Sequence, residues 1–180
     1  AAQTDPVSRD TDETEIRLAT SAGGAARLWK STALASVVVS AIRTQNLLSI
    51  YWDTPDYRLR DRGFALRSRC ADGTGWVQTL KAPARRVDTR REYEAALPGM
   101  QPDLALARSV GWRDDAGLIA IQRELRPLFR TRVVRASRKI RFADGTLADL
   151  ALDRGAIVIE SMPHAPREGV LEIEIELTTG

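Results

Sequence analysis

The clearest structural signal in this sequence is the segment Leu171-Glu172-Ile173-Glu174-Ile175-Glu176-Leu177. Its apolar and acidic residues alternate strictly, which is typical of a β-strand with one apolar and one charged face. Residues two positions apart on a strand lie about 6.5–7 Å from each other on the same face. The three glutamates therefore form a row of like charges, and such a row costs stability unless a cation lies on it.

The same alternation occurs in six further segments. They span residues 13–18, 66–70, 92–94, 129–133, 139–142 and 149–153. Turn-forming pairs such as Asp72-Gly73 and Asp144-Gly145 lie between them. This spacing predicts a mostly antiparallel sheet built from hairpins, in which every strand has a charged face and an apolar face.

Two stretches depart from the alternating pattern. Residues 28–42 are rich in Ala, Leu and Val, which predicts one short helix. In residues 104–125 apolar residues recur every three or four positions and Gly111 interrupts them, which predicts a pair of helices. If the sheet closes into a barrel with its charged face inward, these helices are available to cover the apolar outer face.

Composition limits the class of protein. A chain of 180 residues is long enough for one domain, which we place at residues 13–180 behind a flexible N-terminal segment, residues 1–12. Lys and Arg number 27 against 24 Asp and Glu, so the small net charge of +3 argues against nucleic-acid binding. The lone Cys70 and lone His164 argue against a disulfide and a histidine-based zinc site. No apolar stretch approaches the 20 or so residues of a membrane span, and we expect a cytoplasmic protein.

Acidic and basic residues are sorted onto different predicted strands. Acids gather at Glu13/Glu15, Glu92/Glu94 and the quoted stretch, and bases gather at Arg67/Arg69, Arg130/Arg132 and Lys139/Arg141. Carboxylates bind Mg²⁺ or Mn²⁺, and arginine forks bind phosphate oxygens. The sorting favours a polyanion bridged to metal on one side and held by arginines on the other. The alternative is a solvated face with structural ion pairs, in which Glu92, Glu94 and Asp149 would be the acidic partners.

Seven motifs in order resemble those of one family. Glu13-Thr14-Glu15-Ile16-Arg17 resembles the Glu-x-Glu-x-Lys signature of the CYTH superfamily, also called triphosphate tunnel metalloenzymes. The later matches are 51–56 with 59–69, then 76–81, 91–94, 128–132, 150–155 and 172–177. The first motif alone is weak, but the ordered set is specific and extends over residues 13–180.

The resemblance implies an α+β fold, a closed eight-stranded antiparallel β-barrel (a tunnel) with a charged lumen and a few helices outside. It implies a metal-dependent hydrolase that converts inorganic triphosphate to pyrophosphate and phosphate. The similarity is greatest to bacterial inorganic triphosphatases, in which a CHAD domain often follows the CYTH domain. We therefore expect a possible C-terminal CHAD domain as a partner in the full-length protein.

The resemblance also assigns residue roles. The expected ligands of Mg²⁺ or Mn²⁺ are Glu13, Glu15, Asp153, Glu172 and Glu174, and the expected substrate-binding residues are Arg17, Arg67, Arg69, Lys81, Arg130 and Arg132. Glu13, Glu15 and Arg17 are the expected catalytic residues, although Arg17 stands where the family usually has Lys. Arg135, Lys139 and Arg141 are not assigned, because the alternation after Val134 leaves their face open.

Other functions remain open at this point. An adenylyl cyclase of the same fold, a thiamine or nucleoside triphosphatase, and an RNA 5′-triphosphatase would all present a triphosphate to the same residues. From other classes, the chain could be a non-catalytic polyphosphate-binding module or a purely structural sandwich. The intact acidic residues favour an enzyme, since phosphate binding alone does not need them.

Overall fold

The computed structural model describes residues 9–86, 89–160, 164 and 166–179. Nine strands form one antiparallel sheet: β1 (Arg9–Glu13), β2 (Glu15–Ala19), β3 (Arg43–Asp53), β4 (Ala65–Ala71), β5 (Thr74–Arg86), β6 (Thr89–Leu97), β7 (Arg126–Arg141), β8 (Leu147–Ile159) and β9 (Glu168–Thr179). Their order in the sheet is β1-β6-β5-β4-β3-β7-β8-β9-β2. β1 begins within the segment that was expected to precede the domain, and the side chain of Glu13 lies outside the described part of the chain.

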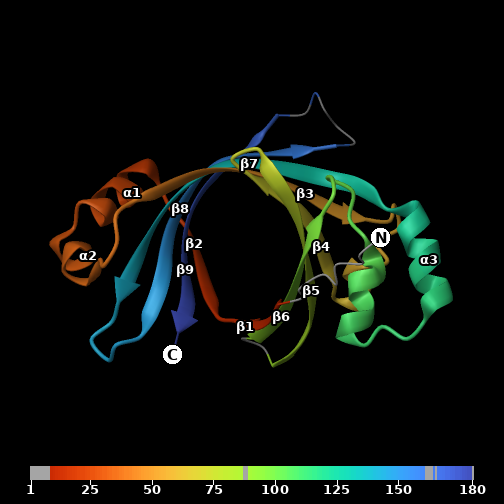
Figure 1. Cartoon of the computed structure of the whole chain (residues 1–180). Coiled ribbons are helices and arrows are strands. Elements are labelled where there is room, and N and C mark those ends of the chain that lie inside the picture. The colour runs from red at the N-terminus through yellow and green to blue at the C-terminus, as the bar shows by residue number, and fades with distance from the viewer. Residues whose placement is uncertain (1–8, 87–88, 161–163, 165, 180) are drawn as a thin grey trace.

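The two edges of this sheet are consecutive pieces of chain. β1 pairs with β6 and β2 pairs with β9, and only Thr14 separates β1 from β2. The Thr14 carbonyl accepts a hydrogen bond of 3.0 Å from Leu177 N. One interrupted strand therefore joins both edges, so the sheet curls into a ring of eight strands around an open centre (Figure 1). The prediction of an eight-stranded antiparallel tunnel is confirmed, with closure made by the covalent chain.

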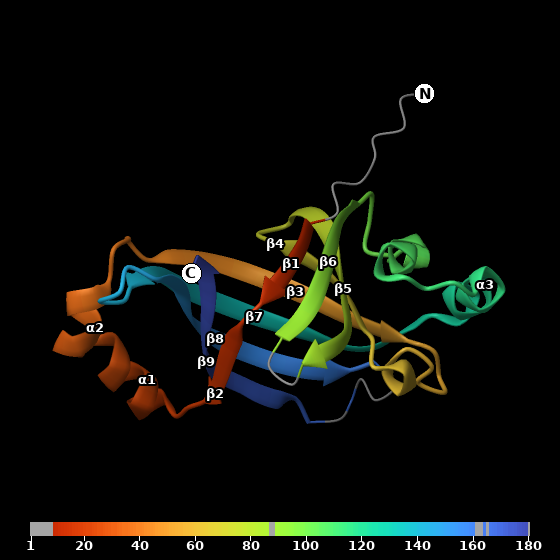
Figure 2. The ribbon, with the colours of Figure 1, turned by 90° about the horizontal axis from the view of Figure 1, so that it is seen from below.

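Helices cover the outer face of the sheet on two sides (Figure 2). The elements are α1 (Ala22–Trp29), α2 (Thr32–Val37), α3 (Asp115–Glu124) and two 3₁₀ helices, η1 (Arg60–Arg62) and η2 (Leu104–Val110). Leu66 and Leu80 of the sheet pack with Leu118 and Ile121 of α3 in one cluster, and Leu150 packs near α2 in a second. Both clusters lie between the outer face of the sheet and the helices, so the core of this protein lies outside the ring. Burial of each leucine side chain there stabilises the fold by about 1.5–3 kcal/mol.

The predicted helices are confirmed in one region and corrected in the other. Residues 104–125 contain the expected pair, η2 and α3, and Gly111 ends the first with φ +86°. Residues 28–42 were expected to hold one helix, whereas the chain forms two helices, α1 and α2. The first of them begins six residues before the expected start. Ser21 and Ser31 cap them by accepting hydrogen bonds from Gly24 N and Leu34 N, and these two local caps explain the division.

β7 is one uninterrupted strand of 16 residues. The segments 129–133 and 139–142, which the sequence suggested as two strands, both belong to it, apart from Phe142. Its register with β8 runs without a shift from Phe129 to Arg141. All odd-numbered residues of this stretch therefore lie on one face, and the even-numbered residues lie on the other.

A buried carboxylate organises the loop after β3. Asp53, only 3 % exposed, accepts hydrogen bonds from Thr54 N at 2.7 Å, Leu59 N at 2.9 Å and Arg60 N at 3.0 Å. The hydroxyl of the buried Thr54 accepts another from Arg58 N at 3.0 Å. The Asp-Thr pair of the family-like motif thus has a structural task in this chain.

No helix in the described residues is long and apolar enough to cross a membrane.

We expect Asp53→Ala to lower the free energy of unfolding by at least about 3 kcal/mol, because three backbone N–H groups lose a charged acceptor in a buried loop. Urea denaturation of the parent and variant measures this. Asp56→Ala, three residues away and exposed, is the control and should leave the midpoint close to that of the parent. Equal midpoints for parent and Asp53→Ala would contradict the structural role.

Candidate functional site

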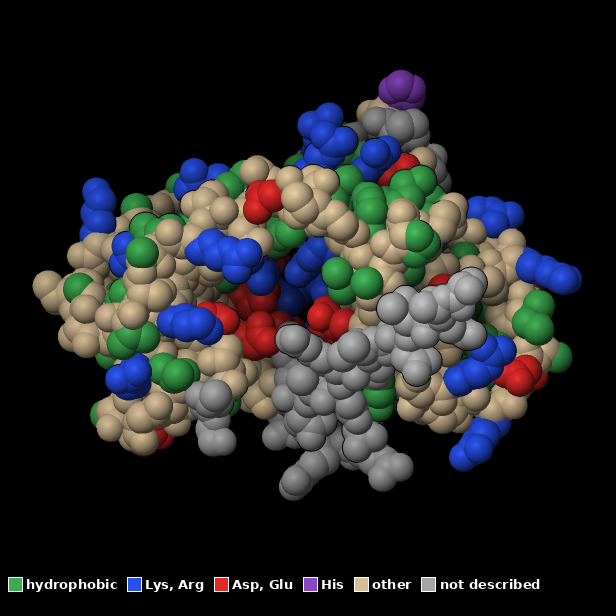
Figure 3. Space-filling model, in the orientation of Figure 1, with side chains coloured by type: hydrophobic (Ala, Val, Ile, Leu, Met, Phe, Trp, Pro, Cys, Tyr) green, Lys and Arg blue, Asp and Glu red, His purple; other side chains and the backbone are tan. Residues whose placement is uncertain are grey.

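The inner face of the ring encloses a charged lumen, formed by two adjoining cavities of about 170 and 230 Å³. Both are lined by Arg17, Arg67, Arg69, Arg135 and Glu174. Figure 3 shows acidic and basic side chains gathered in the hollow at the centre of the ring. The charged faces of β2, β4 and β9 therefore point inward, as the resemblance implied.

One wall of the lumen is basic and is formed mainly by β4. Arg67 Nη2 donates a hydrogen bond of 2.9 Å to Thr79 Oγ1, which in turn donates to Glu94 Oε1 at 3.0 Å. Arg69 Nε donates to the buried Ser49 Oγ at 2.9 Å. In the described part of the chain neither Arg67 nor Arg69 has a carboxylate within ion-pair distance. Their positive charge is available to an anion.

The opposite wall is acidic and is formed by β2, β8 and β9. The register sets Glu15 beside Glu176, Arg17 beside Glu174, and Asp153 beside Glu172. Arg135 binds Asp153 through two hydrogen bonds of 2.8 Å and Glu174 through one of 2.9 Å. The glutamate row of β9 is thus partly neutralised by arginine side chains of the protein itself.

Further ion pairs link this acidic wall to its surroundings. Arg17 lies 3.1 Å from Glu15 and 3.2 Å from Glu174. Lys81 pairs with Glu92 and lies 3.9 Å from Glu15. Lys81–Glu92 is one of the structural ion pairs that the sequence left open, and Lys139–Asp149, at 3.2 Å, is another.

The arginines of the lumen differ in their electrostatic surroundings. Burial works to lower the pKa of Arg17 and of Arg135, but the carboxylates beside them outweigh it and raise both pKa values. For Arg69, burial together with the positive charges of Arg67 and Arg135 lowers the pKa to about 10. Arg69 is therefore a cation held in an unfavourable place, which a bound anion would relieve.

The donor set fits a divalent cation by its chemistry. Among the described residues, seven carboxylates line the lumen against five cationic side chains, before any phosphate is added. Oxygen donors of this kind suit Mg²⁺ or Mn²⁺. No three described acids converge on one point, since Glu174 and Asp153 are turned toward Arg135. A metal ion would have to compete with these ion pairs.

The structure brings together most of the predicted site residues. Glu15 lines the smaller cavity, Asp153 and Glu172 line the larger, and Glu174 lines both. Arg17, Arg67, Arg69 and Lys81 face them. Glu13 cannot be placed in the lumen, because its side chain lies outside the described residues.

The predicted placement of Arg130 and Arg132 is wrong. Both lie on the outer face of β7, where Arg130 pairs with Glu160 at 2.6 Å and Arg132 is exposed. Arg135, which the sequence left unassigned, takes the inward position. Both faces of β7 carry arginines, so alternation alone could not choose between them. The deciding fact is that the strand continues unbroken past Val134.

Sequence reasoning also missed three features of the lumen. Glu92 and Glu94 line it, although neither was among the expected metal ligands or catalytic residues. Ser49 of β3 and Thr79 of β5 hold the arginines of β4 in place. Each hydroxyl residue is the cross-strand partner of the arginine that it binds, and this pairing could have indicated the contact once the register was known. Tyr51 and Phe129 stack on each other in the lining of the 230 Å³ cavity. Nothing in their separate sequence positions indicated this pairing.

We expect opposite effects on stability from two arginine replacements. Arg135→Met should lower the free energy of unfolding by about 3 kcal/mol or more, because Asp153 and Glu174 lose a buried partner. Arg69→Met should not lower it, because that charge lies beside other arginines. Thermal melting of both variants without phosphate compounds measures this. A larger loss in Arg69→Met than in Arg135→Met would contradict the electrostatic description.

Solved structures with a similar fold come from several organisms. A protein of Bacillus halodurans, described as a candidate adenylate cyclase, is 18 % identical over 94 % of this chain and 82 % of its own, with a TM-score of 0.58. A Hippeastrum protein, described as a candidate adenylyl cyclase with a dominant triphosphatase activity, is 21 % identical over 94 % and 80 %, with a TM-score of 0.51. At these identities the likeness concerns the fold.

The family comparison covers nearly the whole sequence. The model of the CYTH domain family matches residues 12–180. The match includes every strand that lines the lumen. The chain therefore belongs to the CYTH domain family, whose members are metal-dependent and act on triphosphate-containing substrates.

Proposed function

We propose that this protein hydrolyses inorganic triphosphate to pyrophosphate and phosphate with the help of Mg²⁺ or Mn²⁺. The observation that carries the proposal is the pair Arg67 and Arg69, two lumen cations without a described carboxylate partner, opposite a wall rich in carboxylates. A linear triphosphate carries several negative charges along a short chain. It would satisfy the basic wall with its oxygens and the acidic wall through divalent cations.

The basic wall would bind and orient the substrate. Arginine donates through a planar fork that matches two phosphate oxygens and keeps its charge at any pH of interest. Arg67 and Arg69 are already fixed by Thr79 and Ser49, so little side-chain freedom is lost on binding. Arg67 Nε is buried without a partner in this structure, and a phosphate oxygen would satisfy it.

The acidic wall would hold the metal. Glu15, Glu174, Glu172 and Asp153 are the described members of the proposed set, and Glu13 is its remaining member. A divalent ion there would supply charge neutralisation at the phosphate oxygens. To accept it, Glu174 would exchange one of its two arginine partners, Arg17 or Arg135, for the ion.

The chemical step needs positioning and charge more than covalent chemistry. Phosphoryl transfer passes through a loose transition state with negative charge on the leaving and peripheral oxygens. Arg67 and Arg69 would stabilise the charge on the leaving pyrophosphate. A glutamate of the acidic wall would orient a water molecule in line with the terminal phosphorus, so no covalent intermediate is required.

Two observations bear on the alternative of a cyclase or another organic triphosphatase. The Hippeastrum neighbour is described as having a dominant triphosphatase activity. In the described lining of the lumen the aromatic side chains are Tyr51 and Phe129, and they stack on each other, so their facing surfaces are not free to hold a base. We therefore prefer a bare triphosphate as the substrate. A CHAD partner domain and a cytoplasmic location stay predictions.

Phosphate release from tripolyphosphate and from ATP, measured side by side with Mg²⁺ or Mn²⁺, tests the proposal. We expect faster release from tripolyphosphate and none in excess chelator. Glu15→Gln should reduce kcat by about 100-fold or more, because a metal-binding carboxylate is lost. Glu160→Gln, which alters an outer ion pair, is the control and should retain activity. Hydrolysis that persists in chelator would refute the metal-dependent mechanism.

Arg17 tests whether its position needs charge or a titratable proton. Glu174 and Glu15 keep this guanidinium protonated, so it can act only as a fixed charge. We expect Arg17→Lys to change kcat/KM for tripolyphosphate by less than about tenfold, whereas Arg17→Met should lose more. A gain above about tenfold in Arg17→Lys, worth roughly 1.4 kcal/mol of barrier, would instead show that a proton is transferred there.

A further inference from the structure

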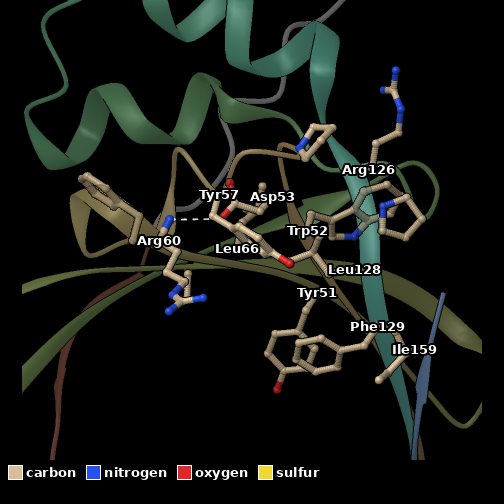
Figure 4. Close-up of a pocket in the computed structure, with 14 residues that line it drawn as sticks. Tyr51, Trp52, Asp53, Tyr57, Arg60, Leu66, Arg126, Leu128, Phe129 and Ile159 are labelled. Carbon is tan, nitrogen blue, oxygen red and sulfur yellow. Dashed lines mark hydrogen bonds between the residues drawn. The ribbon is translucent and has the colours of Figure 1, made fainter. Parts of the chain in front are cut away.

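A large apolar cavity of about 710 Å³ adjoins the lumen (Figure 4). It lies where β3 ends, β4 and β7 begin and the η1 loop crosses. Its lining is mostly aromatic and aliphatic and includes Trp52, Tyr57, Phe64, Leu66 and Leu128. The proposed hydrolysis of a bare triphosphate makes no use of it.

Tyr51 and Phe129 are the residues that line both this cavity and the lumen. They are cross-strand partners on β3 and β7, with ring centroids 4.4 Å apart and ring planes inclined by 17°. Toward the lumen, Tyr51 lies beside Arg67 in the β3–β4 register. Toward the cavity lie Trp52 and Ile159. The two stacked rings therefore form part of the wall between the compartments.

A bulge fixes the position of this wall. The β3–β7 register shifts between Tyr51 and Trp52, so that Trp52 pairs with Pro127. Such irregularities bend a strand and redirect its side chains. The inward face of the two strands thus ends on the stacked rings, and the next residues of the chain belong to the cavity or the outer core.

The two compartments suit different chemical groups. The lumen offers arginines and carboxylates, which suit a phosphate chain and its cations. The cavity offers mainly aromatic and aliphatic surface, and Asp53, Arg60 and Arg126 are the charged residues of its lining. Pockets of this size and lining accommodate organic groups.

We propose that the Tyr51–Phe129 stack is a specificity determinant, which keeps the organic group of an organic triphosphate out of the apolar cavity while its phosphates occupy the lumen. This inference rests on the proposed function and goes beyond it by naming what excludes the larger substrates. A bare triphosphate needs only the lumen and passes this restriction.

The two rings differ in what else they do. Tyr51 contributes to the electrostatic surroundings of both Arg17 and Arg69. Its replacement would therefore alter phosphate binding as well as the wall. Phe129 contributes an apolar ring alone, so its replacement tests the wall with less disturbance of the charged groups.

The test uses Phe129→Ala, with Phe129→Tyr as the variant that retains the ring. Phe142→Ala, the same truncation at an exposed site beyond β7, is the matched control. For each protein kcat/KM is measured with tripolyphosphate and with ATP. We expect the ATP-to-tripolyphosphate ratio to rise by about tenfold or more in Phe129→Ala, and to stay at the parent value in the other two.

Several outcomes would overturn the inference. They are an unchanged ratio in Phe129→Ala, an equal fall with both substrates, and a parent protein that already prefers ATP. A parent that fails to hydrolyse tripolyphosphate with either metal would overturn the proposed function itself, so the two failures are distinguishable. If Phe129→Ala does not melt cooperatively, Phe129→Leu replaces it with the same expected rise in the ratio, because it removes the ring that stacks on Tyr51.

Discussion

The fold depends on charge compensation inside the ring, and its centre is Glu174. This carboxylate, 6 % exposed, lies between Arg17 of β2 and Arg135 of β7. These two ion pairs connect β9 to strands on both of its sides. β9 is also the strand with which β2 pairs when the ring closes. A buried carboxylate without these partners would cost several kcal/mol, so Arg17 and Arg135 make the burial of Glu174 tolerable.

The same compensation prepares the site for its ligand. Each acid on the β2, β8 and β9 wall that is held by an arginine is also a group that a divalent ion could take over. The β4 wall is different, because Arg69 gains nothing from its cationic neighbours. Part of the lumen is thus paired within the protein, whereas Arg67 and Arg69 have no carboxylate within ion-pair distance among the described residues. If the proposed substrate binds there, the unfavourable position of Arg69 is a loss of stability that the bound anion would offset.

Much of the fold could be predicted from the sequence because alternation of charged and apolar residues is a local signal. It marked the strands, and the ordered motifs of residues 13–177 identified the family. The face of β7 could not be predicted, since Arg130, Arg132 and Arg135 occupy both faces and only the unbroken register separates them. The stack of Tyr51 on Phe129 was equally hidden, because two residues far apart in sequence meet only after β3 and β7 pair.

Closure of the ring by β1 and β2 also governs how the chain can fold. β1 pairs with β6, but β2 pairs with β9, the last described strand, as in the pair Glu15 and Glu176. β2 therefore gains its partner only after β9 has formed. Contacts of such wide sequence separation slow folding, because the chain between them must be ordered first. Until then, both edges of the curled sheet expose unpaired backbone groups, which can pair with another chain. β1 and β2 therefore complete the ring, and we expect its edges to be open to pairing with another chain until these two strands are in place.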